Sequence, residues 1–114
     1  MAMIKIAEEH AGDVTIVTVD GRIDSGTAKS LEEKLTGLFR SPRGRVIVDC
    51  RQLAYITSAG LRVLLLAAKL ADKSEGKLAL CSMNVEVRRV FDLGELSDLF
   101  AIYPSREESL AKLA

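Results

Sequence analysis

The strongest constraint on the fold is a pair of short apolar runs separated by a long segment with helical spacing. Residues 45–50 (RVIVDC) and 77–82 (KLALCS) are unbroken in the way that is typical of strands covered on both faces. Between them, residues 58–72 repeat their apolar positions at helical intervals. A strand, a helix and a second strand in this order imply parallel strands joined by a right-handed crossover. The sequence therefore favours an α/β fold.

The connection from the first of these strands to the helix, residues 51–57 (RQLAYIT), is expected to be a loop. The segment KSEG, residues 73–76, ends the helix. In open α/β sheets, functional groups gather at the carboxyl ends of strands, where loops lead into helix N-termini. The start of the helix is therefore the first place to look for function.

Further strands are expected on both sides of this unit. Residues 3–9 and 14–21 alternate or are rich in β-branched side chains, and the turn-like HAGD at 10–13 joins them into a hairpin. Residues 100–104 (FAIYP) are expected to form a last short strand. The sequence thus predicts a small mixed β-sheet, an opening hairpin plus parallel strands, in a single domain over residues 1–114.

About four helices are expected to pack on this sheet, because three more segments have helical spacing or recognisable ends. Besides residues 58–72, these are residues 24–40, 84–94 and 105–114. Their candidate end residues are Asp24 or Ser25, Asn84, Gly94, and the capping-box pair Ser105 and Glu108.

Composition narrows the class of protein. The chain has 114 residues, 48% hydrophobic and 28% charged, which suits one domain with a proper core. Its 16 basic and 16 acidic residues cancel, so charge gives no argument for direct DNA binding or for an anionic membrane. The longest apolar run, Val63–Ala68, is far too short for membrane insertion, and the alternating N-terminal segment is not a signal peptide. We expect a soluble cytoplasmic protein.

The sequence assembles no catalytic or metal site. The single histidine, His10, falls in the expected hairpin turn, and no Ser–His–Asp order or phosphate-binding glycine loop is present. Cys50 and Cys81 lack the spacing of a zinc site. We therefore expect a protein that is not an enzyme and holds no cofactor. The two thiols are expected to be buried at strand ends, with a regulatory disulfide as the alternative.

The long helix opens on two hydroxyl residues, Thr57 and Ser58, followed by the small residues Ala59 and Gly60. A serine at the N-cap has its hydroxyl near free backbone N–H groups and the positive end of the helix dipole. That environment tolerates a phosphate, which adds about −1.5 to −2 charges. The small residues let a kinase approach closely. Ser58 is therefore either a phosphorylation site or only a helix cap, and spacing leaves both open.

The same helix carries leucines beside a basic stripe. At about 100° per residue, Arg62, Lys69 and Lys73 share one stripe, with Leu66 and Leu65 flanking it. The opposite, core-facing side carries Gly60, Leu64, Ala67 and Ala71. Leucines beside a basic stripe are unusual on a purely solvated face, so either a partner surface or partial cover by neighbouring loops accounts for them.

Two blocks of the chain resemble a known family. Residues 46–82 (VIVDCRQLAYITSAGLRVLLLAAKLADKSEGKLALCS) look like the central block of STAS domains, the family of bacterial anti-sigma factor antagonists. The block has an apolar strand ending in Asp, a short loop, and a hydroxyl-rich turn before Gly-Leu and an apolar helix. Residues 19–35 (VDGRIDSGTAKSLEEKL) resemble the earlier block of the family. The resemblance covers nearly the whole chain and implies a STAS-like fold.

The resemblance also implies partner switching in the control of sigma-factor-dependent transcription. The dephosphorylated antagonist binds an anti-sigma factor that is also a serine/threonine kinase, and phosphorylation releases it. A metal-dependent Ser/Thr phosphatase resets the switch. Ser58 matches the phosphorylated serine, and we favour it over Thr57, which stands where many members carry Asp. Asp24 matches the acidic residue of the earlier block, and Asp49 matches the aspartate that ends the strand.

A partner-binding surface follows from the resemblance and from the helix face. It comprises Asp24, Ser25, Thr57, Ser58, Ala59, Gly60, Arg62, Leu66 and Lys69. Asp24 and Asp49 have a simpler alternative as a helix cap and a strand-end acid. The alternative function is that of a STAS subunit of a lipid-transport ATPase or of a signalling scaffold.

Overall fold

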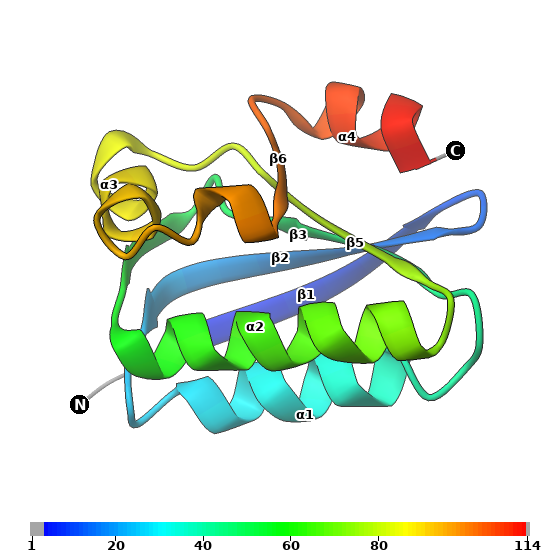
Figure 1. Cartoon of the computed structure of the whole chain (residues 1–114), viewed down its shortest axis with the longest axis horizontal. Coiled ribbons are helices and arrows are strands. Elements are labelled where there is room, and N and C mark those ends of the chain that lie inside the picture. The colour runs from blue at the N-terminus through cyan, green and yellow to red at the C-terminus, as the bar shows by residue number, and fades with distance from the viewer. Residues whose placement is uncertain (1–3, 114) are drawn as a thin grey trace.

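The computed structural model describes residues 4–113, which form a mixed sheet with helices on both faces (Figure 1). The strands are β1 (Ile4–Ala11), β2 (Val14–Ile23), β3 (Arg45–Asp49), β4 (Leu53–Ile56), β5 (Lys77–Cys81) and β6 (Ala101–Tyr103). The helices are α1 (Ala28–Leu38), α2 (Ser58–Lys73), α3 (Val85–Leu93), the short 3-10 helix η1 (Ser97–Leu99) and α4 (Arg106–Leu113).

The sheet confirms the predicted α/β class and the opening hairpin. Its strand order is β1-β2-β3-β5-β6, and β4 pairs with β2 outside this path. β1 and β2 are antiparallel, whereas β2–β3, β2–β4, β3–β5 and β5–β6 are parallel. The hairpin turns through two residues, Gly12 and Asp13, because Ala11 already pairs with Val14. His10 therefore lies in β1 and not in the turn, which corrects the sequence-based placement.

Side chains alternate between two differently covered faces of the sheet. On β3, Val46 and Val48 belong to the larger apolar cluster, which includes residues of α1 and α2, and Ile47 belongs to a smaller cluster with Leu113 of α4. Figure 1 shows α1 and α2 side by side along one face and α4 on the other. The long helix α2 thus presents one side to the sheet and leaves the other free.

Cys50 and Cys81 are both buried, as predicted, and both are free thiols. Cys50 packs in the cluster under α1 and α2, and Cys81 packs in the cluster under α4. The two side chains therefore leave the sheet on opposite faces, although the Cys50 N–H donates to the Cys81 carbonyl at 2.8 Å. Burial raises the pKa of both thiols. The alternative of a regulatory disulfide between them has no support in this geometry.

The segment predicted as a loop at 51–57 contains the strand β4. β2 has ten residues, and only Val14–Thr18 pair with β3. The last residues of β2 pair instead with β4, through the pairs Gly21–Leu53, Arg22–Tyr55 and Ile23–Ile56. Leu53 and Ile56 are buried. The prediction of a loop was wrong because four residues with two apolar positions are too short for a readable strand pattern.

The first helix begins later than predicted. α1 starts at Ala28 behind the N-cap Thr27, and not behind Asp24 or Ser25. The reason is that Asp24 closes a turn of its own, since its Oδ1 accepts the N–H groups of Gly26 at 2.9 Å and Thr27 at 3.1 Å. This turn, residues 24–27, separates β2 from α1.

The predicted caps of the last two helices are confirmed. Asn84 Oδ1 accepts the Val87 N–H at 2.7 Å at the start of α3. The Ser105 hydroxyl accepts the Glu108 N–H at 3.1 Å at the start of α4. Gly94 is the C-cap of α3. Among residues 4–113, no helix combines the length and the apolar composition needed to cross a bilayer.

Candidate functional site

The register of β2 and β4 brings two distant loops together. Ile23 pairs with Ile56, and directly beyond this pair the strands lead into Asp24 and Thr57. The Thr57 N–H donates to the Ile23 carbonyl at 2.9 Å. Figure 1 shows that α1 and α2 begin at the same end of the molecule. The turn 24–27 and the start of α2 therefore form one continuous surface.

Ser58 is exposed and is the first residue of α2. The prediction that it caps the helix is wrong, because the N-cap is Thr57 with an extended backbone. The Ser58 side chain consequently lies at the open N-terminus of a 16-residue helix, where backbone N–H groups are unpaired and the helix dipole is positive. An added phosphate at this position meets favourable charge without displacing a cap.

Thr57 differs from its neighbour in how its hydroxyl is used. Thr57 is partly buried, and its Oγ1 donates to the Ile23 carbonyl at 3.2 Å. It makes no side-chain cap bond to α2. The hydroxyl of Thr57 thus fastens the helix start to the end of β2, which leaves Ser58 as the more accessible hydroxyl of the pair.

The small residues that follow have packing roles. Ala59 is half-buried and Gly60 is buried. A Cβ on Gly60 would lie 2.6 Å from both Ile23 Cγ2 and Ile56 Cγ1. Only glycine therefore lets α2 sit directly on the ends of β2 and β4. Gly60 therefore packs within the core, and its predicted contact with a partner stays a prediction.

The outer face of α2 shows how far neighbouring loops cover Leu65 and Leu66. Leu66 is 43% exposed, so neighbouring loops leave it largely uncovered, and Leu65 is half-buried. Arg62 and Lys69 are exposed beside Leu66. The opposite side confirms the predicted core face, with Gly60, Leu64, Ala67 and Ala71 buried. The exposed face of α2 beyond Ser58 is thus basic with an apolar centre.

Two residues of the turn 24–27 had been predicted as partner contacts. Ser25 is exposed, and Asp24 is half-buried with its Oδ1 accepting two backbone N–H groups. Sequence reasoning missed Thr27, whose buried hydroxyl donates to the Arg22 carbonyl at 2.7 Å. The order Asp-Ser-Gly-Thr is a turn signal that could have identified it.

Sequence reasoning also missed the pairing of Arg22 with Tyr55. The Arg22 guanidinium carbon lies 5.0 Å from the centre of the Tyr55 ring, and both residues are exposed. Their side chains share a face because they are opposite one another in the β2–β4 ladder. The contact could not be predicted from the sequence because β4 was expected to be a loop. It adds a stacked cation and ring near the turn 24–27.

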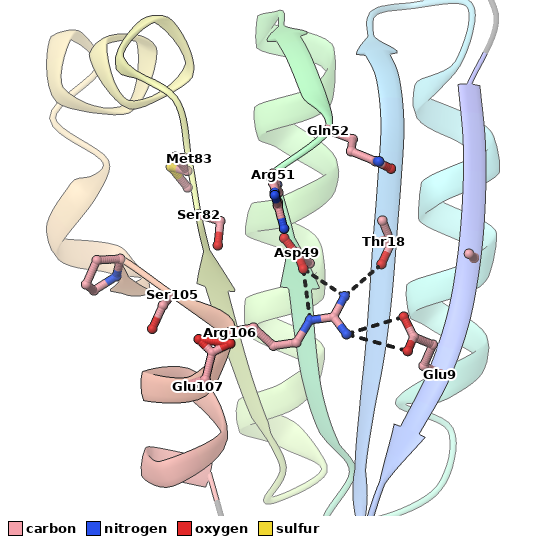
Figure 2. A pocket seen from close by; sticks show the side chains of 12 residues that line it. Glu9, Thr18, Asp49, Arg51, Gln52, Ser82, Met83, Ser105, Arg106 and Glu107 are labelled. Atoms are coloured by element: carbon pink, nitrogen blue, oxygen red, sulfur yellow. Dashed lines mark hydrogen bonds and ion pairs between the residues drawn. The ribbon is translucent and has the colours of Figure 1, made fainter.

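Asp49 belongs to a different cluster from Ser58. It is buried at the end of β3, and its Oδ2 accepts hydrogen bonds from Arg106 Nε at 3.0 Å and Nη2 at 2.9 Å. This pairing raises the pKa of Arg106. Figure 2 shows Arg106 reaching across the sheet to Asp49, Thr18 and Glu9. Asp49 therefore joins α4 to the sheet on the face opposite α2.

The Arg106 cluster borders a hollow of about 870 Å³ on the sheet face between α4 and the end of β5 (Figure 2). Its charged lining residues are Glu9, Asp49, Arg51, Arg106 and Glu107. Three acidic residues outnumber the two cations, so the hollow does not favour an anionic ligand. Within residues 4–113, no group of three or more His, Cys, Asp and Glu side chains could hold a metal ion.

Comparison with known proteins agrees with this architecture. The family model described as STAS domain matches residues 5–109. BtrV of Bordetella bronchiseptica, named as an anti-sigma factor antagonist, is 34% identical over 108 residues, which cover 95% of this chain and 93% of BtrV.

Solved structures show the same fold. The structure of a Thermotoga maritima protein named as an anti-sigma factor antagonist has a TM-score of 0.89 at 21% identity, over 95% of this chain and 93% of that one. One from Mycobacterium paratuberculosis has a TM-score of 0.87 at 26% identity, over 97% and 94% of the two chains. The family-model match and the similarity to BtrV together show that this chain belongs to the STAS-domain family, which includes these anti-sigma factor antagonists.

Proposed function

We propose that this protein is an anti-sigma factor antagonist that binds an anti-sigma factor with serine kinase activity and is released when that kinase phosphorylates Ser58. A metal-dependent Ser/Thr phosphatase restores the binding form. The protein acts by binding and not by catalysis. Its role is exerted in the cytoplasm, where it regulates sigma-factor-dependent transcription through its partner and without contacting DNA.

The observation that carries the proposal is the exposed hydroxyl of Ser58 at the start of α2, beside the turn 24–27. A kinase must reach its target hydroxyl, and a regulatory phosphate must be tolerated by the folded chain. Both conditions hold at the first residue of a helix, since the open backbone N–H groups and the dipole favour negative charge. Relatives named as anti-sigma factor antagonists support the same role.

The surface around Ser58 indicates the chemistry of the partner. Arg62 and Lys69 are exposed on either side of Leu66 along α2. A complementary partner offers an apolar side chain to Leu66 and carboxylates to the two cations. Ser58 lies at the end of this stripe, next to Asp24 and Ser25, so a partner that covers the stripe also covers the hydroxyl.

Only a small change in binding free energy is needed to release the partner. A phosphate forced into a packed interface must lose its hydration, which costs several kcal/mol when it is not paired. A hundredfold loss of affinity requires only about 2.7 kcal/mol. The carboxylates that suit Arg62 and Lys69 would also repel the new charge. One modified hydroxyl is therefore sufficient to release the partner.

Incubation of the purified chain with candidate anti-sigma factor serine kinases from the same organism, with Mg²⁺ and ATP, tests the proposal. Mass spectrometry of the digested product is expected to place one phosphate on Ser58. Ser58→Ala should abolish the label. Thr57→Val should retain it, because the Thr57 hydroxyl bonds to Ile23.

Two results would contradict the proposal. Phosphate on Thr57 in the wild-type chain would assign the switch to the wrong hydroxyl. Failure of every candidate kinase to modify the chain, together with its co-purification with a transport permease, would favour the role of a lipid-transport ATPase subunit.

A further inference from the structure

We propose that Thr27 is a positioning residue that holds the Asp24 carboxylate in place on the partner surface beside Ser58. This inference rests on the proposed function, because it concerns how that surface is assembled. Thr27 lies between β2 and α1, and the resemblance of residues 19–35 to the family block assigns it no role.

The hydroxyl of Thr27 fixes the backbone on both sides of Ile23. Thr27 is 3% exposed, and its Oγ1 donates to the Arg22 carbonyl at 2.7 Å while accepting the Asp24 N–H at 2.9 Å. These two backbone groups flank the point where β2 leaves the sheet. A buried hydroxyl with both bonds satisfied holds the chain direction at that point.

The same turn orients the carboxylate of Asp24. Oδ1 accepts the N–H groups of Gly26 and Thr27, and it lies 3.3 Å from Thr27 Oγ1. Within residues 4–113, the structure assigns no hydrogen bond to Oδ2 of Asp24. One oxygen thus anchors the side chain and the other is available to a donor on the partner.

Thr27 also connects the turn to the start of α2. The carbonyls of Arg22 and Ile23 are consecutive, and they accept from the hydroxyls of Thr27 and Thr57 respectively. Thr27 is the N-cap of α1 but makes no side-chain cap bond to that helix. Its hydroxyl therefore serves the preceding turn and not the helix that follows. This arrangement keeps Asp24 and Ser58 in a fixed relation.

The decisive variants are Thr27→Val, which removes the hydroxyl at nearly constant shape, and Thr27→Ser, which keeps it. Affinity for the partner kinase is measured with the unphosphorylated chain, after circular dichroism has shown that each variant is folded. We expect Thr27→Val to bind about tenfold more weakly and Thr27→Ser to bind within about twofold of the wild type. Asp24→Asn should weaken binding as well. The double variant Thr27→Val/Asp24→Asn should bind no more weakly than Asp24→Asn alone, because both changes act through one carboxylate.

Three results would overturn this role. Thr27→Val could bind as tightly as the wild type, Thr27→Ser could bind as weakly as Thr27→Val, or the two losses could add in the double variant. The second result would mean that the hydroxyl alone does not position Asp24, because serine keeps the hydroxyl and loses only the methyl group.

Hydrogen exchange without a partner separates this inference from the proposed function. The Gly26 and Thr27 amides, which bond to Asp24, should exchange faster in Thr27→Val than in Thr27→Ser. Unchanged protection in Thr27→Val would overturn the positioning role even if the kinase binds. If exchange rises as expected but the wild-type chain binds no kinase, the proposed function fails and the presentation of Asp24 to a partner fails with it.

Discussion

Arg106 of α4 forms an ion pair with Asp49 at the end of β3, and its Nε and Nη2 donate to the same carboxylate oxygen at 3.0 and 2.9 Å. The Asp49 side chain is only 6% exposed, and its Oδ1 accepts the Arg51 N–H at 3.0 Å. The two residues are 57 positions apart in sequence. This ion pair therefore holds the C-terminal helix on the face of the sheet that α1 and α2 do not cover.

Arg106→Ala should lower the free energy of unfolding by about 2 kcal/mol. Removing one member of a buried pair costs roughly 3–5 kcal/mol when the other charge is stranded, and water reaching the half-exposed Arg106 site reduces this cost. Urea unfolding measures the change. Arg88→Ala is the control, because its pair with Asp92 is exposed and should contribute less than about 1 kcal/mol. Equal losses in the two variants would contradict a special role for Asp49.

Gly60→Ala should destabilise the fold by roughly 1–3 kcal/mol through overpacking against Ile23 and Ile56. Gly37→Ala in α1 is the matched control, since a Cβ there meets nothing within 4 Å. Alanine should stabilise that helix by up to about 1 kcal/mol. Thermal unfolding of both variants checks the prediction, and a stabilising Gly60→Ala would show that α2 does not pack on the strand ends as described.

Leu66→Asp should weaken partner binding at least tenfold while leaving Tm nearly unchanged, because Leu66 is 43% exposed. Leu64→Ala, on the buried side of the same helix, should instead lower stability by about 2–5 kcal/mol. Calorimetric titration and thermal melts distinguish the two effects. A large fall in Tm for Leu66→Asp would place Leu66 in the core.

Glu8 of β1 should contribute stability that is lost in acid. A hydrogen bond from the Lys34 side chain, aided by the charges of Lys34 and His10, lowers the pKa of Glu8 below its usual 4.5 despite the opposing effect of desolvation. A lowered folded-state pKa adds stability above the unfolded-state value and loses it as pH falls through the folded-state value. The advantage of the wild type over Glu8→Gln in urea unfolding should therefore be present at about pH 6 and disappear at about pH 3. An advantage that grows in acid would contradict the assigned pair.

Much of the fold could be predicted because its pattern is repeated over many residues. The unbroken runs of β3 and β5 and the helical spacing of α2 each contain several apolar positions that agree. β4 could not be predicted in the same way. Its pairing depends on β2 extending beyond β3, and the length of a neighbouring strand is a tertiary property that four residues do not encode.

The candidate site was predictable in its location and less so in its details. The hydroxyl at the start of α2 and the nearby Asp24 were identified from sequence, but the cap was assigned to Ser58 and not to Thr57. One residue separates these alternatives, and local propensity does not resolve a helix boundary that finely. Gly60 was predicted on both the core face and the partner surface, and its close approach to Ile23 confirms the core contact.

Contacts between residues that are distant in sequence could not be predicted from any local sequence pattern. Arg106 meets Asp49 only after α4 has crossed the sheet, and Arg22 meets Tyr55 only through the β2–β4 ladder. Thr27 is different, because the turn order Asp-Ser-Gly-Thr was readable and its hydroxyl bonds are local.

Release by phosphorylation is measured directly by the affinity of the partner kinase for the chain with and without phosphate on Ser58. Both forms are titrated calorimetrically under one set of conditions, and circular dichroism verifies that the phosphorylated form keeps its fold. We expect a loss of affinity of about hundredfold or more on phosphorylation. Equal affinity of the two folded forms would contradict it.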